Sequence, residues 1–299
     1  MSQRTAYLNW KYLPESEAKV SILDLGFRIG DGVYDVARTY RHRPFKLREH
    51  IQRLFRSLRF TRISIDLTPA EFEAVCLRVL EANVPLLREN EDYSLWMNVS
   101  RGQPQGPGAG PTVAVSCVPI NFQGFAHAFT EGIRLRTSSI RRIPPECLDP
   151  KAKVTNKMNH ILADLDVKSA DPDAYSLMLD VHGNLAENSA ANLFLVKKGR
   201  LLTPSRRNVL EGVTRETVLE LAHSLRIPAE EGDLTLYDAY TAEEAFLTGT
   251  TPTILPVRSL DGREYPGDVP GPMTTRLLRS WSELVGMDII AQTLSHVNP

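Results

Sequence analysis

The chain has 299 residues, of which 42% are hydrophobic, and a formal net charge of -1 at pH 7. This length and apolar content suffice for two domains of ordinary size. Basic residues gather only in short clusters, Arg41–Arg43 and Arg141–Arg142, which we interpret as solvated loops. The balanced charge excludes the extended basic face of a nucleic-acid-binding protein.

Cysteine usage and hydropathy narrow the class further. Cys76, Cys117 and Cys147 are widely spaced and odd in number, so we expect neither a disulfide framework nor a metal site. Met1–Thr5 has no apolar core, and no apolar run reaches the roughly 18 residues of a membrane span. We therefore expect a cytoplasmic protein without a membrane partner.

The first part of the chain predicts an α+β arrangement. Apolar spacing predicts a helix over residues 69–86, and β-rich runs predict strands over 93–99, 112–118 and 133–137. Residues 102–111 are so rich in glycine and proline that we expect a loop there, with no regular element.

A second group of elements follows a break near residues 121–127. Strands alternate with helices there, which suggests sheet layers covered by helices. We expect strands over 175–180, 192–196 and 245–247 and helices over 154–169 and 214–225. The predicted division is a small α+β domain over 1–120, an interdomain loop over 121–132 and a large α/β domain over 133–299.

Two segments indicate chemistry, the run Lys153–Asn156 and a carboxylate, Glu187, a little over thirty residues later. A lysine that forms a Schiff base must lose its proton near neutral pH, and a carboxylate facing a pyridine nitrogen keeps that nitrogen protonated. The pair has the composition of a pyridoxal phosphate site. As a bare spacing it also fits a solvated lysine, and Lys151 competes for the nucleophile role.

A phosphate group needs backbone N–H groups at a helix start, hydroxyls and a guanidinium. Gly212, Val213 and Thr214 open a predicted helix, so their N–H groups and the Thr214 hydroxyl can face an anion. Thr214 alone also fits a plain helix N-cap. Gly249 and Thr250, at the end of a β-rich run, supply a second hydroxyl and close backbone approach.

Six ordered segments resemble the class IV aminotransferases, the fold type IV pyridoxal phosphate enzymes, over nearly the whole chain. They are Asp24–Asp35, Glu49–Leu54, Lys153–Asn156, Glu187–Phe194, Leu210–Arg215 and Thr248–Thr251. The resemblance implies a two-domain α+β fold like that of D-amino-acid aminotransferase, pyridoxal 5'-phosphate as cofactor, and a homodimer or higher homo-oligomer.

The resemblance also implies residue roles. Lys153 holds the cofactor as a Schiff base and moves a proton on the substrate, while Glu187 keeps the ring nitrogen cationic. Lysine with asparagine three residues on fits Lys153 and not Lys151. The remaining cofactor-binding residues are Arg53, Leu210, Gly212, Val213, Thr214, Gly249 and Thr250, and the substrate-binding residues are Tyr34, Thr251 and Arg101.

Subfamily features disagree about the substrate. Gly30–Asp35 resembles D-amino-acid transaminases, yet the arginine and histidine that those enzymes carry after an Arg-Gly pair are missing after Arg101. The Gly249–Thr250 pair resembles branched-chain aminotransferases, whose tyrosine five residues past the lysine is Met158 here. Ile143–Glu146 resembles (R)-amine transaminases. L-amino acids, D-amino acids and (R)-amines therefore all stay open as donors.

We predict a transaminase that moves an amino group between an amino acid or amine and a 2-oxo acid. The alternatives are 4-amino-4-deoxychorismate lyase, which shares nearly every motif, and more remotely a non-catalytic binding protein on this fold. We also expect the loop over 102–111 to cross toward the neighbouring subunit and to hold the substrate carboxylate.

Overall fold

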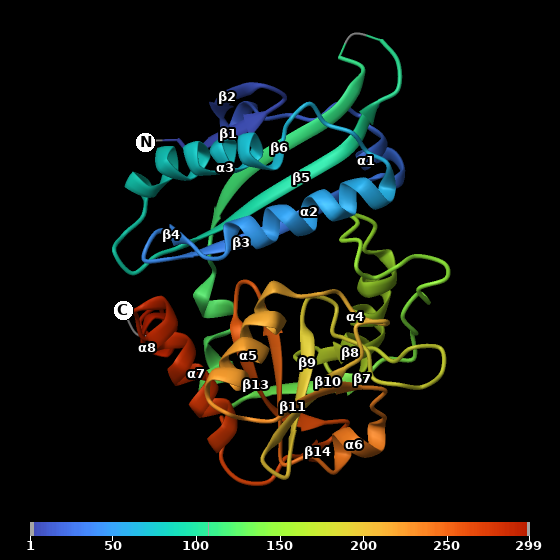
Figure 1. Ribbon diagram of the computed structural model, residues 1–299, viewed down its shortest axis with the longest axis vertical. Helices are drawn as coiled ribbons and strands as arrows, with labels where there is room; N and C mark the ends of the chain where they lie inside the picture. Colours follow the sequence, from blue (N-terminus) through green and yellow to red (C-terminus); the bar gives the residue numbers. More distant parts are fainter. Residues whose placement is uncertain (1–2, 107, 298–299) are drawn as a thin grey trace. The chain divides into compact units, whose positions relative to one another are not determined.

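The computed structural model describes residues 3–106 and 108–297, so Pro107 of the glycine-rich segment lies outside the described residues. The chain divides into two compact units (Figure 1). The first comprises Met1–Ile120 with Ala152–Lys157, and the second comprises Asn121–Lys151 with Met158–Pro299. The segment expected as an interdomain loop, 121–132, therefore groups with the second unit.

A six-stranded antiparallel sheet forms the first unit, in the order β2-β1-β6-β5-β3-β4. Its strands are β1 (Thr5–Leu8), β2 (Lys11–Pro14), β3 (Gly32–Tyr40), β4 (Arg43–Pro44), β5 (Tyr93–Gln103) and β6 (Gly110–Pro119). Its helices are η1 (Glu15–Glu17), α1 (Leu25–Ile29), α2 (Leu47–Thr61), α3 (Pro69–Asn83) and η2 (Val84–Leu86).

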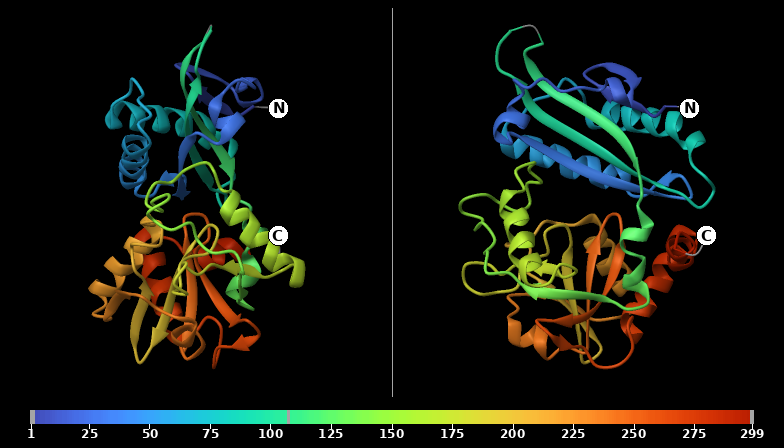
Figure 2. Two further views of the ribbon diagram at one scale, coloured as in Figure 1. Left: turned by 90° about the vertical axis from the view of Figure 1, so that its right-hand side faces the viewer. Right: turned by 180° about the vertical axis from the view of Figure 1, so that it is seen from behind.

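Helices α2 and α3 cover one face of this sheet (Figure 2). Alternation along β5 explains the burial, because Leu95, Met97 and Val99 enter the core while Trp96, between them, stays 37% exposed. Helix α3 begins at Pro69 because Thr68 and Glu71 form a reciprocal capping box.

The expectation of an irregular loop over 102–111 was wrong at both ends. Strand β5 runs to Gln103 and β6 starts at Gly110, so the two strands form one long hairpin. A register shift between Ser100 and Gln103 accommodates Gly102 at φ +73°. A Cβ on Gly102 would overlap the Gly110 carbonyl, so only glycine lets the strands continue this far.

An eight-stranded sheet forms the second unit, in the order β11-β10-β9-β12-β13-β7-β8 with β14 paired to β13. Pairs β10–β11, β7–β13 and β7–β8 are parallel. The strands are β7 (Ile133–Thr137), β8 (Tyr175–Leu177), β9 (Asn192–Lys197), β10 (Arg200–Pro204), β11 (Ala229–Gly232), β12 (Glu244–Gly249), β13 (Thr253–Leu260) and β14 (Arg263–Glu264). The helices are η3 (Phe122–Gly124), η4 (Ala126–Phe129), α4 (Met158–Ala170), α5 (Val213–Ser224), α6 (Leu236–Tyr240), α7 (Pro272–Val285) and α8 (Ile289–Leu294).

The helix expected over 154–169 begins only at Met158. Val154 forms an antiparallel bridge with Val33, and the Thr155 N–H donates to the Gly32 carbonyl at 2.9 Å. These bonds hold residues 154–155 extended against β3, so this part of the predicted helix belongs to the first unit.

Within the described part of the chain, no helix is long and apolar enough to cross a bilayer. The described residues also contain no cluster of three or more His, Cys, Asp or Glu side chains that could hold a metal ion.

Candidate active site

Lys153 is fixed by its backbone. Its N–H donates to the Ser57 hydroxyl on α2 at 3.0 Å, and its carbonyl accepts from the Tyr34 N–H on β3 at 2.9 Å. The Lys153 ammonium lies 4.6 Å from the centre of the Tyr34 ring. A flexible lysine side chain thus extends from a rigid base, as a nucleophile must.

Lys151, the competing lysine, faces a different environment. Its side chain is 43% exposed, and its ammonium pairs with Asp149 at 3.2 Å. An exposed ion pair keeps an amine protonated, which is the opposite of what a Schiff-base lysine requires. The geometry therefore favours Lys153.

Arg53 lies in a buried cluster with Asp35 and His50. Its Nε and Nη2 donate to the two Asp35 oxygens, each at 2.8 Å, and His50 Nδ1 lies 2.8 Å from Asp35 Oδ1. Burial alone would raise the pKa of Asp35, but Arg53 and His50 hold it well below its usual range. Burial lowers the pKa of His50, against the opposing effect of Asp35. Asp35 thus fixes the Arg53 fork in one orientation.

The two substrate residues expected in the first unit differ in setting. Tyr34 is half-buried and stacks on Trp96 with ring centres 5.9 Å apart. The Arg101 guanidinium instead donates to the Asp31 carboxylate and to the carbonyls of Thr61 and Arg62, at 2.6–3.1 Å. These internal acceptors favour a structural role for Arg101 over the expected substrate role.

Glu187 is 4% exposed, and both of its oxygens have partners. Oε1 lies 3.0 Å from Arg142 Nη2 and 3.9 Å from His160 Nε2. Oε2 accepts from the Leu210 N–H at 3.0 Å and from Asn192 Nδ2 at 3.2 Å. Burial alone would raise the pKa of Glu187, but the His160 hydrogen bond, the Arg142 charge and the Leu210 N–H lower it to about 2. Glu187 is therefore a carboxylate at neutral pH.

Three of these partners escaped the sequence analysis. Arg142, interpreted above as part of a solvated loop, is 8% exposed and paired with Glu187, so that interpretation was wrong. His160 lies on α4 and Asn192 on β9. A buried carboxylate requires a partner, which predicts that some cation exists but not which one.

The predicted phosphate residues surround the start of α5. Gly212 is the N-cap residue, Val213 and Thr214 open the helix, and no side chain caps its N–H groups. Thr214 is thus inside the first turn and is not the N-cap considered above. Leu210, half-buried, precedes this turn.

A second hydroxyl segment ends β12. Thr248 pairs with Asn192 across β9, and Gly249, Thr250 and Thr251 follow it, the two threonines half-buried. Thr248 Oγ1 is buried and has no hydrogen-bond partner among the described residues. An uncapped helix start and an unpaired buried hydroxyl both fit an anionic ligand.

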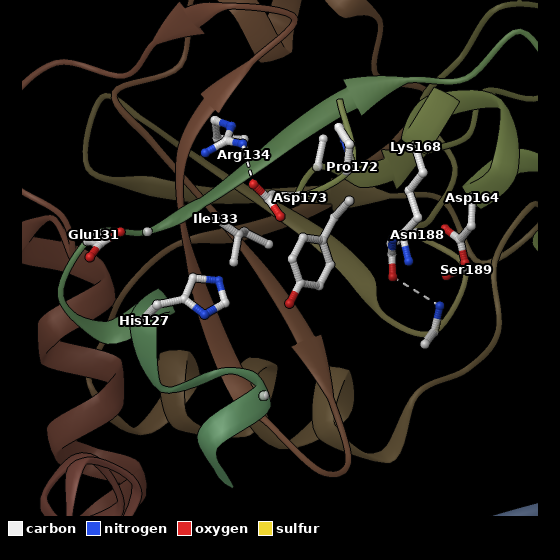
Figure 3. Close-up of a pocket in the computed structure, with 15 residues that line it drawn as sticks. His127, Glu131, Ile133, Arg134, Asp164, Lys168, Pro172, Asp173, Asn188 and Ser189 are labelled. Carbon is white, nitrogen blue, oxygen red and sulfur yellow. Dashed lines mark hydrogen bonds and ion pairs between the residues drawn. The ribbon is translucent and has the colours of Figure 1, made fainter. Parts of the chain in front are cut away.

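A pocket of about 620 Å³ also opens on the second unit, beside Asn188–Ala190 (Figure 3). Among its lining residues, Arg134 pairs with Asp171 at 2.9 Å and Asp164 accepts from the Ser176 hydroxyl at 2.5 Å. None of the predicted catalytic or cofactor-binding residues lines this pocket. Its volume therefore does not identify it as the catalytic site.

Comparisons with known proteins agree with the residues assembled above. The model of the family described as amino-transferase class IV matches residues 32–260. A Methanocaldococcus jannaschii protein, provisionally named a branched-chain-amino-acid aminotransferase, is 36% identical and aligns over 93% of this chain and 95% of its own. A D-alanine aminotransferase of Bacillus licheniformis is 29% identical, over 89% and 92%.

Solved structures agree in fold. The branched-chain aminotransferase of Thermoproteus uzoniensis, solved with norvaline, superposes with a TM-score of 0.85 at 29% identity, over 95% of each chain. A branched-chain aminotransferase of T.th., solved with pyridoxamine 5'-phosphate, gives 0.84 at 29% identity, also over 95% of each chain.

The names of these relatives favour amine transfer over the lyase reaction and over a non-catalytic protein. The fold is the expected fold type IV, and the cofactor is pyridoxal 5'-phosphate. The chain belongs to the class IV aminotransferases and is a pyridoxal-phosphate-dependent transaminase, which moves an amino group between an amino acid or amine and a 2-oxo acid.

Proposed function

We propose that this transaminase takes its amino group from branched-chain amino acids, and that Lys153 and Glu187 serve its cofactor. The observation that carries the assignment of Glu187 is its buried carboxylate, held ionised by Arg142 and His160 with a pKa of about 2. The uncapped start of α5 and the unpaired Thr248 hydroxyl fit a phosphate in the same unit.

When bound, pyridoxal phosphate supplies a protonated ring that stabilises negative charge at the substrate Cα. A permanently ionised Glu187 holds the proton on the ring nitrogen, because a carboxylate with a pKa of about 2 does not take that proton back near neutral pH. Gly212, Val213 and Thr214 would present N–H groups and a hydroxyl to the phosphate. Arg53 would add a guanidinium whose direction Asp35 fixes.

Lys153 would bind the cofactor covalently and, once displaced by substrate, move a proton at the substrate Cα. This task needs an amine that loses its proton readily. Burial disfavours the charged form of an amine, and Lys153 is half-buried whereas Lys151 is exposed. Because Ser57 and Tyr34 hold the Lys153 backbone, the amine can return to one position in each cycle.

Two observations support an apolar substrate side chain. Tyr34 and Trp96 form a stacked aromatic surface beside the Lys153 ammonium, and Val36 is their neighbour on the same face of the sheet. Such a surface stabilises aliphatic side chains by burial and offers no charge to a second carboxylate. Several relatives are named branched-chain aminotransferases, and one of them was solved with norvaline.

The decisive experiment is the first half-reaction, followed by the cofactor spectrum in a stopped-flow instrument. We expect L-valine, L-leucine and L-isoleucine to convert the cofactor faster than D-alanine or an (R)-amine does, and 2-oxo acids to restore it. Preferred conversion by D-alanine would assign the chain to D-amino-acid transaminases, which the Bacillus licheniformis relative also represents.

We further propose a homodimer, because α4 carries an exposed apolar face. Met158, Ile161, Leu162 and Leu165 recur at helical spacing and are 45–59% exposed, while His160, Ala163 and Val167 occupy the buried face. A second copy of this chain is the proposed occupant. Cytoplasmic location and the domain limits near residue 120 remain part of the proposal.

The β5–β6 hairpin completes the proposed dimer by reaching the substrate site of the neighbouring copy. Gln103 pairs with Gly110, so residues 104–109 can be replaced by an Asn-Gly turn without breaking the strands. This variant should show a raised substrate KM and an unchanged cofactor spectrum. An unchanged KM would remove the hairpin from the proposal.

A further inference from the structure

Glu187 and Asn192 face each other across a tight turn in the second unit. The two residues form an antiparallel bridge, and the Asn188 N–H donates to the Ala191 carbonyl at 2.9 Å to close the turn. Directly opposed residues of such a bridge project their side chains to the same face. Both side chains are buried, each residue being 4% exposed.

The Asn192 amide joins two parts of the proposed cofactor site. Its Nδ2 donates to Glu187 Oε2 at 3.2 Å and to the Leu210 carbonyl at 3.0 Å. The Leu210 N–H donates to the same Glu187 oxygen at 3.0 Å, so the three groups form a closed ring of hydrogen bonds. Leu210 leads into Gly212, the N-cap of α5.

The other side of the amide determines which residue can occupy position 212. A Cβ built on Gly212 would overlap Asn192 Oδ1, and the amide cannot swing away without breaking its bonds to Glu187 and Leu210. The backbone of Asn192 is itself fixed, since it pairs with Thr248 on β12, directly before Gly249 and Thr250. Asn192 therefore connects the carboxylate, the start of α5 and the end of β12.

From this geometry we infer that Asn192 is a positioning residue that sets the Glu187 carboxylate at a fixed place relative to the N-terminus of α5. The ring nitrogen and the phosphate of one cofactor molecule are then met at matched positions. Charge does not explain the role, because Arg142 supplies the cation and Asn192 is neutral. The inference rests on the proposed role of Glu187 toward the ring nitrogen.

The test reads the ring nitrogen directly, by 15N NMR of the enzyme reconstituted with 15N-labelled pyridoxal phosphate. Asn192→Ala should move the ring resonance toward the unprotonated form and weaken cofactor binding by about tenfold, since two hydrogen bonds are lost, one of them to a charged group. Asn192→Asp keeps the shape but places a second carboxylate against Glu187, so its ring resonance should move further.

Asn208→Ala is the matched control. Its Nδ2 also donates to a carboxylate in the same unit, Asp180 Oδ2 at 2.7 Å, and its recorded bond is with neither Glu187 nor Leu210. Its 15N resonance and cofactor affinity should equal those of the wild type. An equal change in this control would reduce the Asn192 effect to general loosening of the unit.

Gly212→Ala provides a second, independent measurement. Alone it should weaken cofactor binding, because its methyl group displaces Asn192. Combined with Asn192→Ala, the overlap disappears, and the double variant should bind the cofactor as well as Asn192→Ala does. Additive losses in the double variant would overturn the inference, because they would mean that positions 192 and 212 act independently.

Glu187→Gln separates the two levels of the proposal. If Glu187→Gln leaves the ring 15N resonance unchanged, the role of Glu187 fails, whatever Asn192 does. If Glu187→Gln moves the resonance but Asn192→Ala and Asn192→Asp do not, only the positioning role of Asn192 is wrong. Thermal unfolding of each apoenzyme shows that the compared variants are folded.

Discussion

The backbone bonds of Lys153 and the ion pair of Lys151 place two neighbouring lysines in different chemical states. Lys153→Ala should abolish the absorbance of the lysine-bound cofactor and lower turnover by several orders of magnitude, as expected for a residue that acts as both nucleophile and proton carrier. Lys151→Ala should change turnover little, because its ammonium is exposed and paired with Asp149. Borohydride reduction followed by peptide mapping is the measurement, and a pyridoxyl adduct on Lys151 would contradict the assignment.

Arg142 and Arg141 are adjacent and allow a matched comparison. Arg142 is 8% exposed and pairs with Glu187 at 3.0 Å, whereas Arg141 is exposed. Breaking a buried pair by removing one partner costs about 3 kcal/mol or more, because the other charge stays buried without it. Arg142→Met should therefore lower the free energy of unfolding by about 3 kcal/mol at pH 7 in urea titrations. Arg141→Met should change it by less than about 0.5 kcal/mol.

The same pair predicts a pH dependence. Folding lowers the pKa of Glu187 to about 2, below the roughly 4.3 of an unfolded glutamate. Its ionised form therefore stabilises the fold above about pH 4.3, and this contribution is lost as the pH falls toward 2. Without the Arg142 guanidinium the pKa rises, so Arg142→Met should begin to lose this stabilisation at a higher pH. Urea titrations at successive pH values would detect the shift, and superimposable pH profiles would contradict it.

Hairpin β5–β6 shows how a single glycine sets the length of an element. Gly102 and Gly108 both have positive φ, at +73° and +80°, but only a Cβ on Gly102 would meet backbone atoms. Gly108→Ala should cost about 1 kcal/mol from conformational strain alone. Gly102→Ala should cost clearly more, because the overlap with Gly110 adds to the same strain. Equal losses in urea titrations would mean that the hairpin can open around position 102.

Element boundaries show where sequence reasoning succeeded and where it failed. Helix α5 and strands β7 and β9 lie within a residue of their expected limits, because their apolar periodicity is local. The start of α4 was misplaced by four residues, since Val154 and Thr155 bond to β3, which is remote in sequence. Hydrogen bonds between distant segments leave no periodic pattern in either one.

The candidate site divides in the same way. Lys153, Glu187 and the residues around α5 were predicted because motifs and a family resemblance mark them. Arg142, His160 and Asn192 were missed because their roles follow from contact with Glu187, which only the fold creates. Arg101 was assigned to substrate by its position in a motif, yet its donors meet internal acceptors. Motifs therefore identified the groups expected to touch the cofactor better than the groups that hold them in place.

At the scale of the whole molecule, α4 gives the proposed dimer a specific test. Leu165 on α4 and Leu284 on α7 are both helical leucines, 59% and 50% exposed. Leu165 belongs to the four-residue apolar face of α4, and an introduced charge there would have to be buried by a second copy, at a cost of several kcal/mol. Leu165→Glu should therefore shift the sedimenting mass from twice 33.5 kDa toward 33.5 kDa, while Leu284→Glu should leave the dimer intact. A fully active wild-type monomer in analytical ultracentrifugation would refute the dimer, and with it the proposed reach of the β5–β6 hairpin into a neighbouring substrate site.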